Sequence, residues 1–278
     1  MVVNADDFGL STGVNRGIEA SFHDGILRSA SLMPNGDAFA DAVRIARQTP
    51  ALGVGIHLCL VGERCVAPHE ELGGLVDDAG FLPASYTAFV RGYYQRRFTR
   101  RDIRREVAAQ VQRVLDAGIR PTHLDSHQHV HLSPAVFDIA LAAARAANIA
   151  VIRVPHERRP LKDGLNTRGV QLRILALLCR RAARRAHRAR LRFARSFWGL
   201  NVSGALDESA LLRVLENARP GVNEVMAHPG ISDAALRQKY QWGYRWDAEA
   251  AALQSSAVRH LVESRRIRLA HFGQAWQC

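Results

Sequence analysis

The chain of 278 residues has little cysteine and no long apolar run. Its four cysteines, Cys59, Cys65, Cys179 and Cys278, are scattered without a CxxC pair, so neither a disulfide framework nor a cysteine zinc site is indicated. No apolar stretch reaches the roughly 18 residues that a membrane-spanning helix needs, and the first residues, MVVNADDFGL, lack the basic and apolar regions of a signal peptide. These absences predict a cytoplasmic protein.

What the chain contains is the composition of an ordinary globular protein, with 47% hydrophobic and 23% charged residues. Its length is close to the roughly 250 residues of one (β/α)8 barrel. Short apolar or β-branched runs alternate with longer segments of helical period, as in βα units around a parallel sheet. Strands are expected at residues 2–6, 29–33, 53–58, 121–125, 150–154, 222–227 and 267–271, with a weaker eighth at 197–201.

Helices are expected between these strands, at residues 14–24, 38–47, 101–117, 134–147, 207–218 and 248–263. Gly118 closes the third of these helices, and Ser133 followed by Pro134 is a favourable start for the fourth. Residues 62–97 are rich in glycine, proline and aromatics and are expected to form a loop-like segment over one end of the barrel. With no repeat and no hinge-like linker, residues 1–278 are predicted to form a single domain.

Polar residues follow several of the predicted strands directly. Asn4, Asp6 and Asp7 lie at the end of the first strand, His57 in the third and His228 after the one that ends at residue 227. The carboxyl ends of parallel strands converge, and functional groups gather there in α/β folds. These side chains are therefore expected to share one site.

Four of the twelve histidines lie within nine residues, at 123, 127, 129 and 131. All share parity with Asp125, so in an extended backbone they would project to one side. Any single one is better explained as a helix cap or as part of a buried hydrogen-bonded network. Together with His57 and the two aspartates, the cluster favours a metal site, because two histidines and a carboxylate form a recurrent catalytic set.

The adjacent aspartates Asp6 and Asp7 have two interpretations. In the first, one of the two aspartates is simply a turn residue or a helix cap and has no role in a site. Both reach one site only if the strand breaks there, and Gly9 makes such a break plausible. The motif at His228 is also compatible with a simple Pro-Gly turn.

Four motifs in this order resemble the YdjC-like carbohydrate deacetylases, with most similarity to the hopanoid-biosynthesis-associated members. They are NADDFG (from Asn4), GIHL (from Gly55), THLDSHQHVH (from Thr122) and HPG (from His228). The resemblance implies a divergent, TIM-like (β/α) barrel of seven or eight strands that removes an acetyl group from an N-acetylated sugar. The first strand is short for the family, which leaves open whether Met1 is the true start.

The resemblance also implies roles for individual residues. Asp7, His57 and His127 are the expected ligands of one divalent metal, Asp6 the general base and His228 the candidate acid. Four further residues are expected to orient these groups or to bind substrate: Asn4, Asp125, His129 and His131. The nitrogen ligands suit zinc, cobalt or nickel, and the family resemblance keeps magnesium in consideration.

The net charge of +12 is concentrated in one segment, because ten arginines and no acidic residue lie between Arg168 and Arg195. Apolar residues at spacings of three and four predict a basic helical insertion at about 155–195. This helix either is an ordinary solvated outer helix, or makes a peripheral contact with the inner face of an anionic membrane or with a partner. Nucleic-acid binding is not expected, because no aromatic residue is interleaved with residues 168–192.

Other functions remain compatible with the sequence. A metal-dependent phosphoesterase would often use two metals about 4 Å apart, whereas only one good ligand set is evident here. A non-catalytic barrel that binds membrane or nucleic acid through the basic segment is a further alternative. The expected partner of a deacetylase is an acetylated sugar or glycolipid, and a homodimer is compatible with the sequence.

Overall fold

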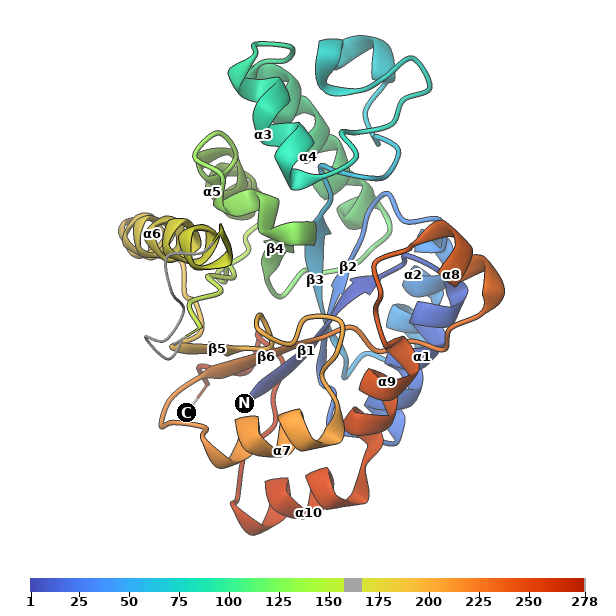
Figure 1. The fold of residues 1–278 in the computed structure, drawn as a ribbon, viewed down its shortest axis with the longest axis vertical. Coiled ribbons are helices and arrows are strands. Elements are labelled where there is room, and N and C mark those ends of the chain that lie inside the picture. Colours follow the sequence, from blue (N-terminus) through green and yellow to red (C-terminus); the bar gives the residue numbers. More distant parts are fainter. Residues whose placement is uncertain (158–166, 278) are drawn as a thin grey trace.

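The computed structural model describes residues 1–157 and 167–277 and is built around one curled parallel sheet (Figure 1). Its strands are β1 (Val2–Phe8), β2 (Ser29–Leu32), β3 (Gly53–Leu58), β4 (Leu124–Ser126), β5 (Ser196–Trp198) and β6 (Asn223–Ala227). Their spatial order is β4-β3-β2-β1-β6-β5. Every pairing is parallel, so the carboxyl ends of all six strands lie at one edge.

The expectation of seven or eight strands is wrong for the described residues, where six are formed. Residues 150–153 make only isolated parallel bridges: the amide of Leu124 donates to the Val151 carbonyl, and that of Ile152 to the Arg192 carbonyl. This short segment connects the edge strand β4 to the chain just before β5. Residues 267–271 form no strand. They meet the start of β1 through two hydrogen bonds, from the Ala270 amide to the Met1 carbonyl and from the Met1 amino group to the Arg268 carbonyl.

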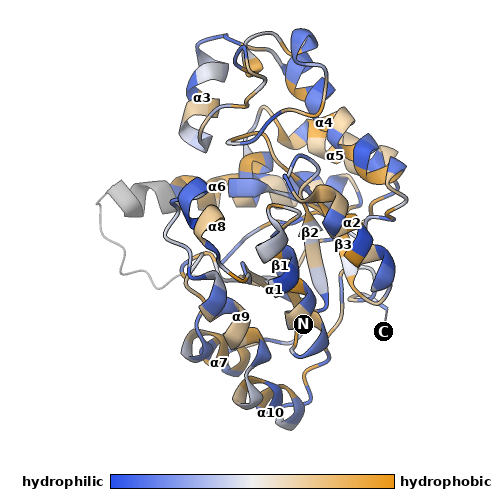
Figure 2. Cartoon of the chain, turned by 90° about the vertical axis from the view of Figure 1, so that its right-hand side faces the viewer, coloured by the Kyte–Doolittle hydropathy of each residue, from blue (hydrophilic) through white to orange (hydrophobic). Residues whose placement is uncertain are grey.

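The helices surround the sheet (Figure 1). They are α1 (Thr12–His23), α2 (Phe39–Gln48), α3 (Tyr86–Tyr94), α4 (Arg100–Asp116), α5 (Phe137–Ala146), α6 (Thr167–Arg188), α7 (Glu208–Glu216), α8 (Ala234–Lys239), α9 (Trp246–Gln254) and α10 (Ser256–Ser264). Helix α1 packs on β1 and α9, and α4 packs on β3 and α5. Figure 2 shows hydrophilic and hydrophobic residues along the same outer helices, as expected when one face of a helix is buried.

Local side-chain chemistry explains several helix boundaries. Helix α4 begins at a capping box in which the Thr99 hydroxyl accepts from the Asp102 amide and the Asp102 carboxylate accepts from the Thr99 amide. It ends before Gly118, whose φ of +73° is a left-handed conformation that glycine adopts without strain. Helix α5 starts three residues later than predicted, because residues 134–136 form a turn.

Three other expectations about helices need correction. Residues 62–97 contain α3 and two short 3₁₀ turns, His69–Glu71 and Gly73–Leu75. The predicted helix at 248–263 is two helices, because Ser255 ends α9 and its side chain caps α10. Helix α8 was not predicted. None of the described helices combines the length and apolar character that crossing a membrane requires.

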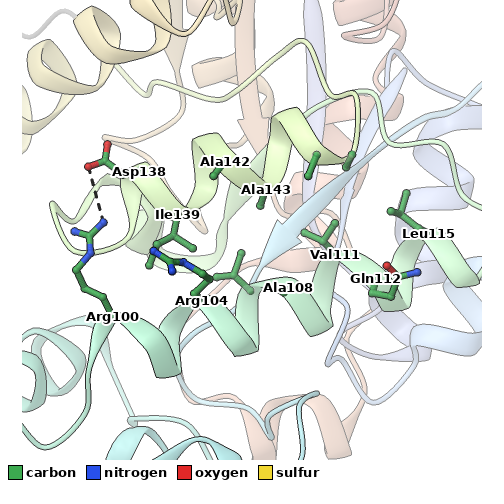
Figure 3. Close-up of a pocket in the computed structure, with 13 residues that line it drawn as sticks. Arg100, Arg104, Ala108, Val111, Gln112, Leu115, Asp138, Ile139, Ala142 and Ala143 are labelled. Atoms are coloured by element: carbon green, nitrogen blue, oxygen red, sulfur yellow. Dashed lines mark ion pairs between the residues drawn. The ribbon is translucent and has the colours of Figure 1, made fainter.

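Helices α4 and α5 leave an apolar groove of about 390 Å³ on the outer side of the fold (Figure 3). Val107, Val111 and Ala143 lie in its wall, and Arg100 and Asp138 form an ion pair at its rim. It contains none of the candidate site residues. The polar side chains of interest instead lie at the carboxyl edge of the sheet.

Candidate active site

A kink at the end of β1 gives Asp6 and Asp7 different surroundings. The register of β1 against β2 shifts between Ala5 and Phe8, and Asp7 has a φ of +62°. A non-glycine residue rarely adopts this conformation, which is often retained where a site needs it. The kink therefore lies at Asp7 itself, before Gly9, and both carboxylates are buried.

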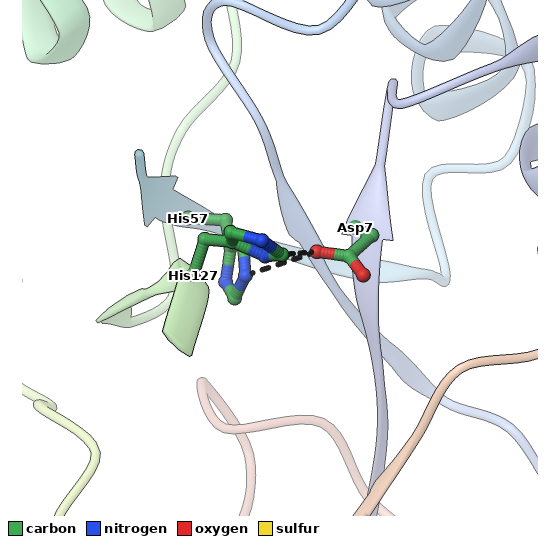
Figure 4. Close-up of side chains that lie close together, drawn as sticks. All are labelled: Asp7, His57 and His127. Carbon is green, nitrogen blue, oxygen red and sulfur yellow. Dashed lines mark hydrogen bonds and ion pairs between the residues drawn. The ribbon is translucent and has the colours of Figure 1, made fainter. Parts of the chain in front are cut away.

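The Asp7 carboxylate faces two imidazole rings (Figure 4). Its Oδ1 atom lies 2.9 Å from His127 Nδ1 and 3.3 Å from His57 Nε2. Its other oxygen, Oδ2, is buried and has no hydrogen-bond partner. Asp7, His57 and His127, from the ends of β1, β3 and β4, are called the Asp7 cluster below.

Electrostatic coupling in the Asp7 cluster is strong. Burial alone would raise the pKa of Asp7, but His127 and His57 hold it well below its ordinary range. Burial alone would lower the pKa of His57, but Asp125 and Asp7 raise it to about 10. The surroundings thus favour the ionised form of the Asp7 carboxylate and the protonated form of the His57 imidazole.

A second cluster surrounds the guanidinium of Arg153, the largest fully buried side chain among the described residues. Arg153 donates to both oxygens of Asp6, at 2.6 and 2.7 Å, and to Glu224 Oε1 at 2.6 Å. Its Nη1 also lies 2.8 Å from Asp125 Oδ2. Arg153, Asp6, Asp125 and Glu224 are called the Arg153 cluster below.

The charge balance of the Arg153 cluster is uneven, since three carboxylates share one guanidinium. Burial alone would raise the pKa of Asp125, but Arg153 and His57 hold it well below its ordinary value. Burial outweighs Arg153 at Glu224 and raises its pKa to about 7. The Glu224 Oε2 atom is buried without a hydrogen-bond partner.

Asp125 connects the two clusters. Its Oδ1 atom lies 2.8 Å from His57 Nδ1, which leaves His57 Nε2 facing Asp7. Such a carboxylate contact fixes the orientation of an imidazole. The Ser31 hydroxyl donates to Asp125 Oδ2 at 2.8 Å, and the Asn4 amide donates to Asp6 Oδ1 at 2.9 Å and to Ser31.

The histidine run does not project to one side, so that expectation is wrong. Residues 127–132 form a 3₁₀ segment, η3 (His127–Leu132), with positive φ at Gln128 and His129. His127 turns into the Asp7 cluster. The His131 ring lies between the Ser126 hydroxyl, 2.5 Å from Nδ1, and the Arg153 carbonyl, 3.0 Å from Nε2. Burial lowers the pKa of His131 to about 4 and that of His129 well below its ordinary value.

His228 lies at the same edge of the sheet, because Ala5 of β1 pairs with Ala227 of β6. Its amide donates to Glu249, and its Nδ1 lies 3.8 Å from Glu249 Oε2. Nδ1 is buried and makes no hydrogen bond. The register therefore brings Asp6 and His228 to adjacent strand ends.

Alternate residues of the segment 240–246 are aromatic and pack in series. Successive ring centroids of Tyr240, Trp242, Tyr244 and Trp246 are 4.7, 5.4 and 5.8 Å apart. Residues 240–246 are called the aromatic strap below. The Arg245 amide donates to the Gly204 carbonyl at 2.7 Å and so attaches the strap to the segment before α7.

The aromatic strap covers both candidate histidines. The Trp242 ring lies 5.1 Å from the His127 ring, and the Tyr244 ring lies 4.7 Å from the His228 ring. Trp242 and Tyr244 are only half-buried. They therefore present aromatic surface next to the Asp7 cluster.

The site residues predicted from the sequence do not include Arg153, Glu224, Ser31 or the aromatic strap. A signal existed for some of them. Arg153 is an arginine inside the apolar run VIRV, and Glu224 is an acid inside the strand NEVMA. A charged side chain in a buried strand needs a partner of opposite charge. An arginine in one such strand and a glutamate in another therefore indicate a buried ion pair between them. Ser31 carries no comparable signal.

The ligand atoms of Asp7, His57 and His127 lie within 4.8 Å of one another, which fits one divalent ion held by two nitrogens and an oxygen. The unpartnered Oδ2 of Asp7 also fits a ligand at this position. Asp6, His57 and Asp125 satisfy the same distance limit. However, Arg153 already forms ion pairs with both of these carboxylates, so a cation there would face a guanidinium.

Fold and site together define an α/β protein with a buried two-histidine, one-aspartate site at the carboxyl edge of a parallel sheet. Residues 1–264 match the family model described as YdjC-like protein, and the chain belongs to this family. A carbohydrate deacetylase of Brevibacillus brevis is 32% identical over 276 residues, covering 99% of this chain and 98% of its own.

Two further relatives are similar. A chitooligosaccharide deacetylase of Salmonella typhimurium is 32% identical, covering 98% of this chain and 97% of its own. A carbohydrate deacetylase of Geobacillus stearothermophilus is 44% identical over 166 residues, covering 58% of this chain and 64% of its own. A solved structure from Enterococcus faecalis V583, provisionally described as a cellobiose-phosphate cleavage protein, has a TM-score of 0.76 at 24% identity. It covers 98% of this chain and 96% of its own, and it supports the fold alone.

Proposed function

We propose that the protein is a metal-dependent hydrolase that removes the acetyl group from an N-acetylated sugar. The observation that carries this proposal is the Asp7 cluster, in which one carboxylate oxygen faces two imidazole nitrogens while a second carboxylate, Asp6, lies beside it. The names of the related deacetylases support the same reaction class.

Asp7, His57 and His127 would hold one divalent ion, with zinc or magnesium as first choices and cobalt or nickel also compatible with this ligand set. When bound, such an ion supplies Lewis-acid polarisation of the amide carbonyl and acidifies water. Asp125 keeps the His57 ring in the orientation that this role requires, through its contact with Nδ1.

Asp6 serves as the general base that accepts a proton from the attacking water. Arg153 and Asn4 fix its carboxylate with three hydrogen bonds, so the base is held in place before substrate binds. His228, at the adjacent strand end, donates a proton to the departing amine. The products are acetate and the free amino sugar.

The half-buried Trp242 and Tyr244 provide a surface for the apolar face of a pyranose ring. They lie on His127 and His228, so a sugar stacked on the aromatic strap would present its acetamido group to both. A chitooligosaccharide fits this proposal, as does an N-acetylglucosaminyl glycolipid such as a hopanoid-linked one. The same single domain would act as a cytoplasmic enzyme, and a homodimer is compatible with it.

A two-metal phosphoesterase is less well supported. A second metal would need Asp6 and Asp125, but both carboxylates already form ion pairs with Arg153. A non-catalytic barrel would have no use for an ionised, buried Asp7 that faces two imidazoles, because such an arrangement costs desolvation free energy.

The test is incubation of the protein and Zn²⁺ or Mg²⁺ with N,N′-diacetylchitobiose and, separately, with an N-acetylglucosaminyl lipid. Mass spectrometry should show loss of one acetyl group from at least one of them and release of acetate. The Asp7→Asn variant is the control for a contaminating enzyme. Intact substrates with metal-loaded wild-type protein would overturn the proposal.

A further inference from the structure

The inner face of α6 packs against the barrel. Cys179, Ala182 and Ala186 are buried, and Leu175 and Leu178 are half-buried at the same helical spacing. The helix contacts η3, the segment that carries His127. This packing accounts for the apolar stripe of the arginine-rich segment.

The outer face of α6 carries a different set of residues. Ile174 is 53% exposed and Leu177 is 62% exposed, two of the five most exposed large hydrophobic side chains of the described protein. Five exposed arginines occur at spacings of three or four residues from Leu177 or from one another, so they share its face: Arg173, Arg180, Arg181, Arg184 and Arg188. These seven residues are called the α6 outer face below.

No acid balances this charge within the segment, since no Asp or Glu occurs between Arg168 and Arg195. Asp138 of α5 contacts this helix through its ion pair with Arg185, at 2.5 Å. Asp138 also pairs with Arg100, at 3.9 Å (Figure 3). The α6 outer face therefore combines cationic groups with exposed aliphatic side chains.

We propose that the α6 outer face docks on the surface of an anionic lipid membrane. Arginines bind lipid phosphates, while Ile174 and Leu177 enter the boundary between headgroups and acyl chains. An exposed helix with only charges on its surface would be explained by solvation. Ile174 and Leu177 lie on the same face as these arginines, and a lipid surface gives their exposed aliphatic side chains an apolar environment as well.

Other occupants fit less well. A second copy of the chain related by two-fold symmetry would place the same arginine-rich face against itself, with like charges opposed. A nucleic acid would attract the arginines through its phosphates, but it offers no apolar phase for Ile174 and Leu177. Docking does not depend on the proposed deacetylase reaction, because no residue of the Asp7 or Arg153 cluster belongs to this face.

The experiment is co-sedimentation of the full chain with phosphatidylcholine vesicles that contain or lack phosphatidylglycerol. Binding should require the anionic lipid and should fall steeply as salt shortens the Debye length from about 30 Å at 0.01 M to about 8 Å at 0.15 M. Replacing Arg180, Arg181, Arg184 and Arg188 together by Gln should weaken partitioning by about 100-fold or more at low salt.

The matched control removes the same charge elsewhere. Arg91, Arg97, Arg101 and Arg104 are also exposed, and replacing these four by Gln should leave partitioning within about threefold of the wild type. A second variant, Ile174→Ser with Leu177→Ser, keeps every arginine and should weaken partitioning about tenfold.

The results that would overturn the proposal are specific. If vesicle binding weakens equally in the α6 variant and in the control variant with four other arginines replaced, net charge alone drives the binding. No effect of the double serine variant, together with equal binding to a duplex DNA, would assign the face to polyanions. The melting temperature of each variant must match that of the wild type, and the arginine and serine variants provide independent tests if one fails to fold.

Discussion

Asp6 and Asp7 are adjacent in the chain, yet the first lies in the Arg153 cluster and the second in the Asp7 cluster. Both are buried at the end of the same strand. Asp6 accepts two hydrogen bonds from a guanidinium, whereas Asp7 faces two imidazoles and keeps one oxygen unpartnered. The difference shows how a single kink at Asp7 separates two identical side chains into two environments.

The comparison also shows why the two carboxylates are expected to differ in function. A carboxylate that a fixed guanidinium already satisfies is poorly available to a cation, but it is well oriented to accept a proton. A carboxylate that faces two imidazole nitrogens fits the ligand set that we propose for a metal.

Removal of an imidazole from the Asp7 cluster should have the largest effect. In His57→Ala or His127→Ala the site loses one of three protein ligands. We expect metal affinity to fall by at least about 100-fold and deacetylation to fall below detection. Metal content after gel filtration, measured by mass spectrometry, checks this. His69→Ala, at an exposed histidine, is the control. Full metal occupancy in both site variants would refute the ligand assignment.

Asp6→Asn should retain metal and lose turnover. The amide keeps the size of the side chain but cannot accept the proton of water, and loss of a general base costs about 10²- to 10⁴-fold in kcat. Asp7→Asn should instead lose metal. The two variants, assayed side by side for metal and kcat, form a matched pair. A metal-free Asp6→Asn protein would show that Asp6 is a ligand.

Arg153→Met should destabilise the fold. It leaves three carboxylates buried without their cation, and removing one partner of a buried ion pair costs about 3 to 5 kcal/mol. Urea unfolding measures the loss. Arg153→Lys, which retains one positive charge, should lose less. An unchanged free energy of unfolding in Arg153→Met would mean that the cluster is already neutral in the native protein.

Glu224→Gln should change the pH dependence of stability. The native pKa of Glu224 is raised from 4.5 to about 7. Between pH 4.5 and 7 the carboxyl is therefore protonated in the native protein and ionised in the unfolded chain. This contribution is present below pH 4.5 and is lost as pH rises through about 7. The free energy of unfolding of the wild type, relative to Glu224→Gln, should therefore fall by roughly 2 to 3 kcal/mol from pH 4.5 to 7.5. A constant difference would contradict the raised pKa.

Much of the fold follows from hydrophobic patterning. All six observed strands overlap predicted ones, of which the strand at 197–201 was the weakest, because each is a short apolar or β-branched run. Helix α4 lies close to its predicted position, since Thr99 caps its start and Gly118 follows its end. Residues 150–154 were predicted as a strand but make only isolated bridges, since β4, their neighbour, is three residues long. The sequence pattern of one strand does not reveal the length of the neighbouring strand with which it must pair.

The candidate site was predictable in its motifs but not in its contacts. Asp6, Asp7, His57, His127 and His228 follow strands whose carboxyl ends meet, so their convergence at one edge was expected. The different surroundings of Asp6 and Asp7 were not expected, because they depend on Arg153. This residue is 146 positions away from Asp7 in the sequence, and the bridge between its segment and β4 places it beside Asp6. His131 illustrates the reverse case. It lies within the same motif as His127, but the turn at η3 directs it to the Arg153 carbonyl.

The most direct measurement is the anomalous diffraction of crystals grown with Zn²⁺. We predict one peak in contact with Asp7, His57 and His127, with Asp6 still accepting both hydrogen bonds from Arg153. A peak among Asp6, His57 and Asp125, the other group of candidate ligands within 4.8 Å of one another, would contradict this account, because it requires that Arg153 be displaced.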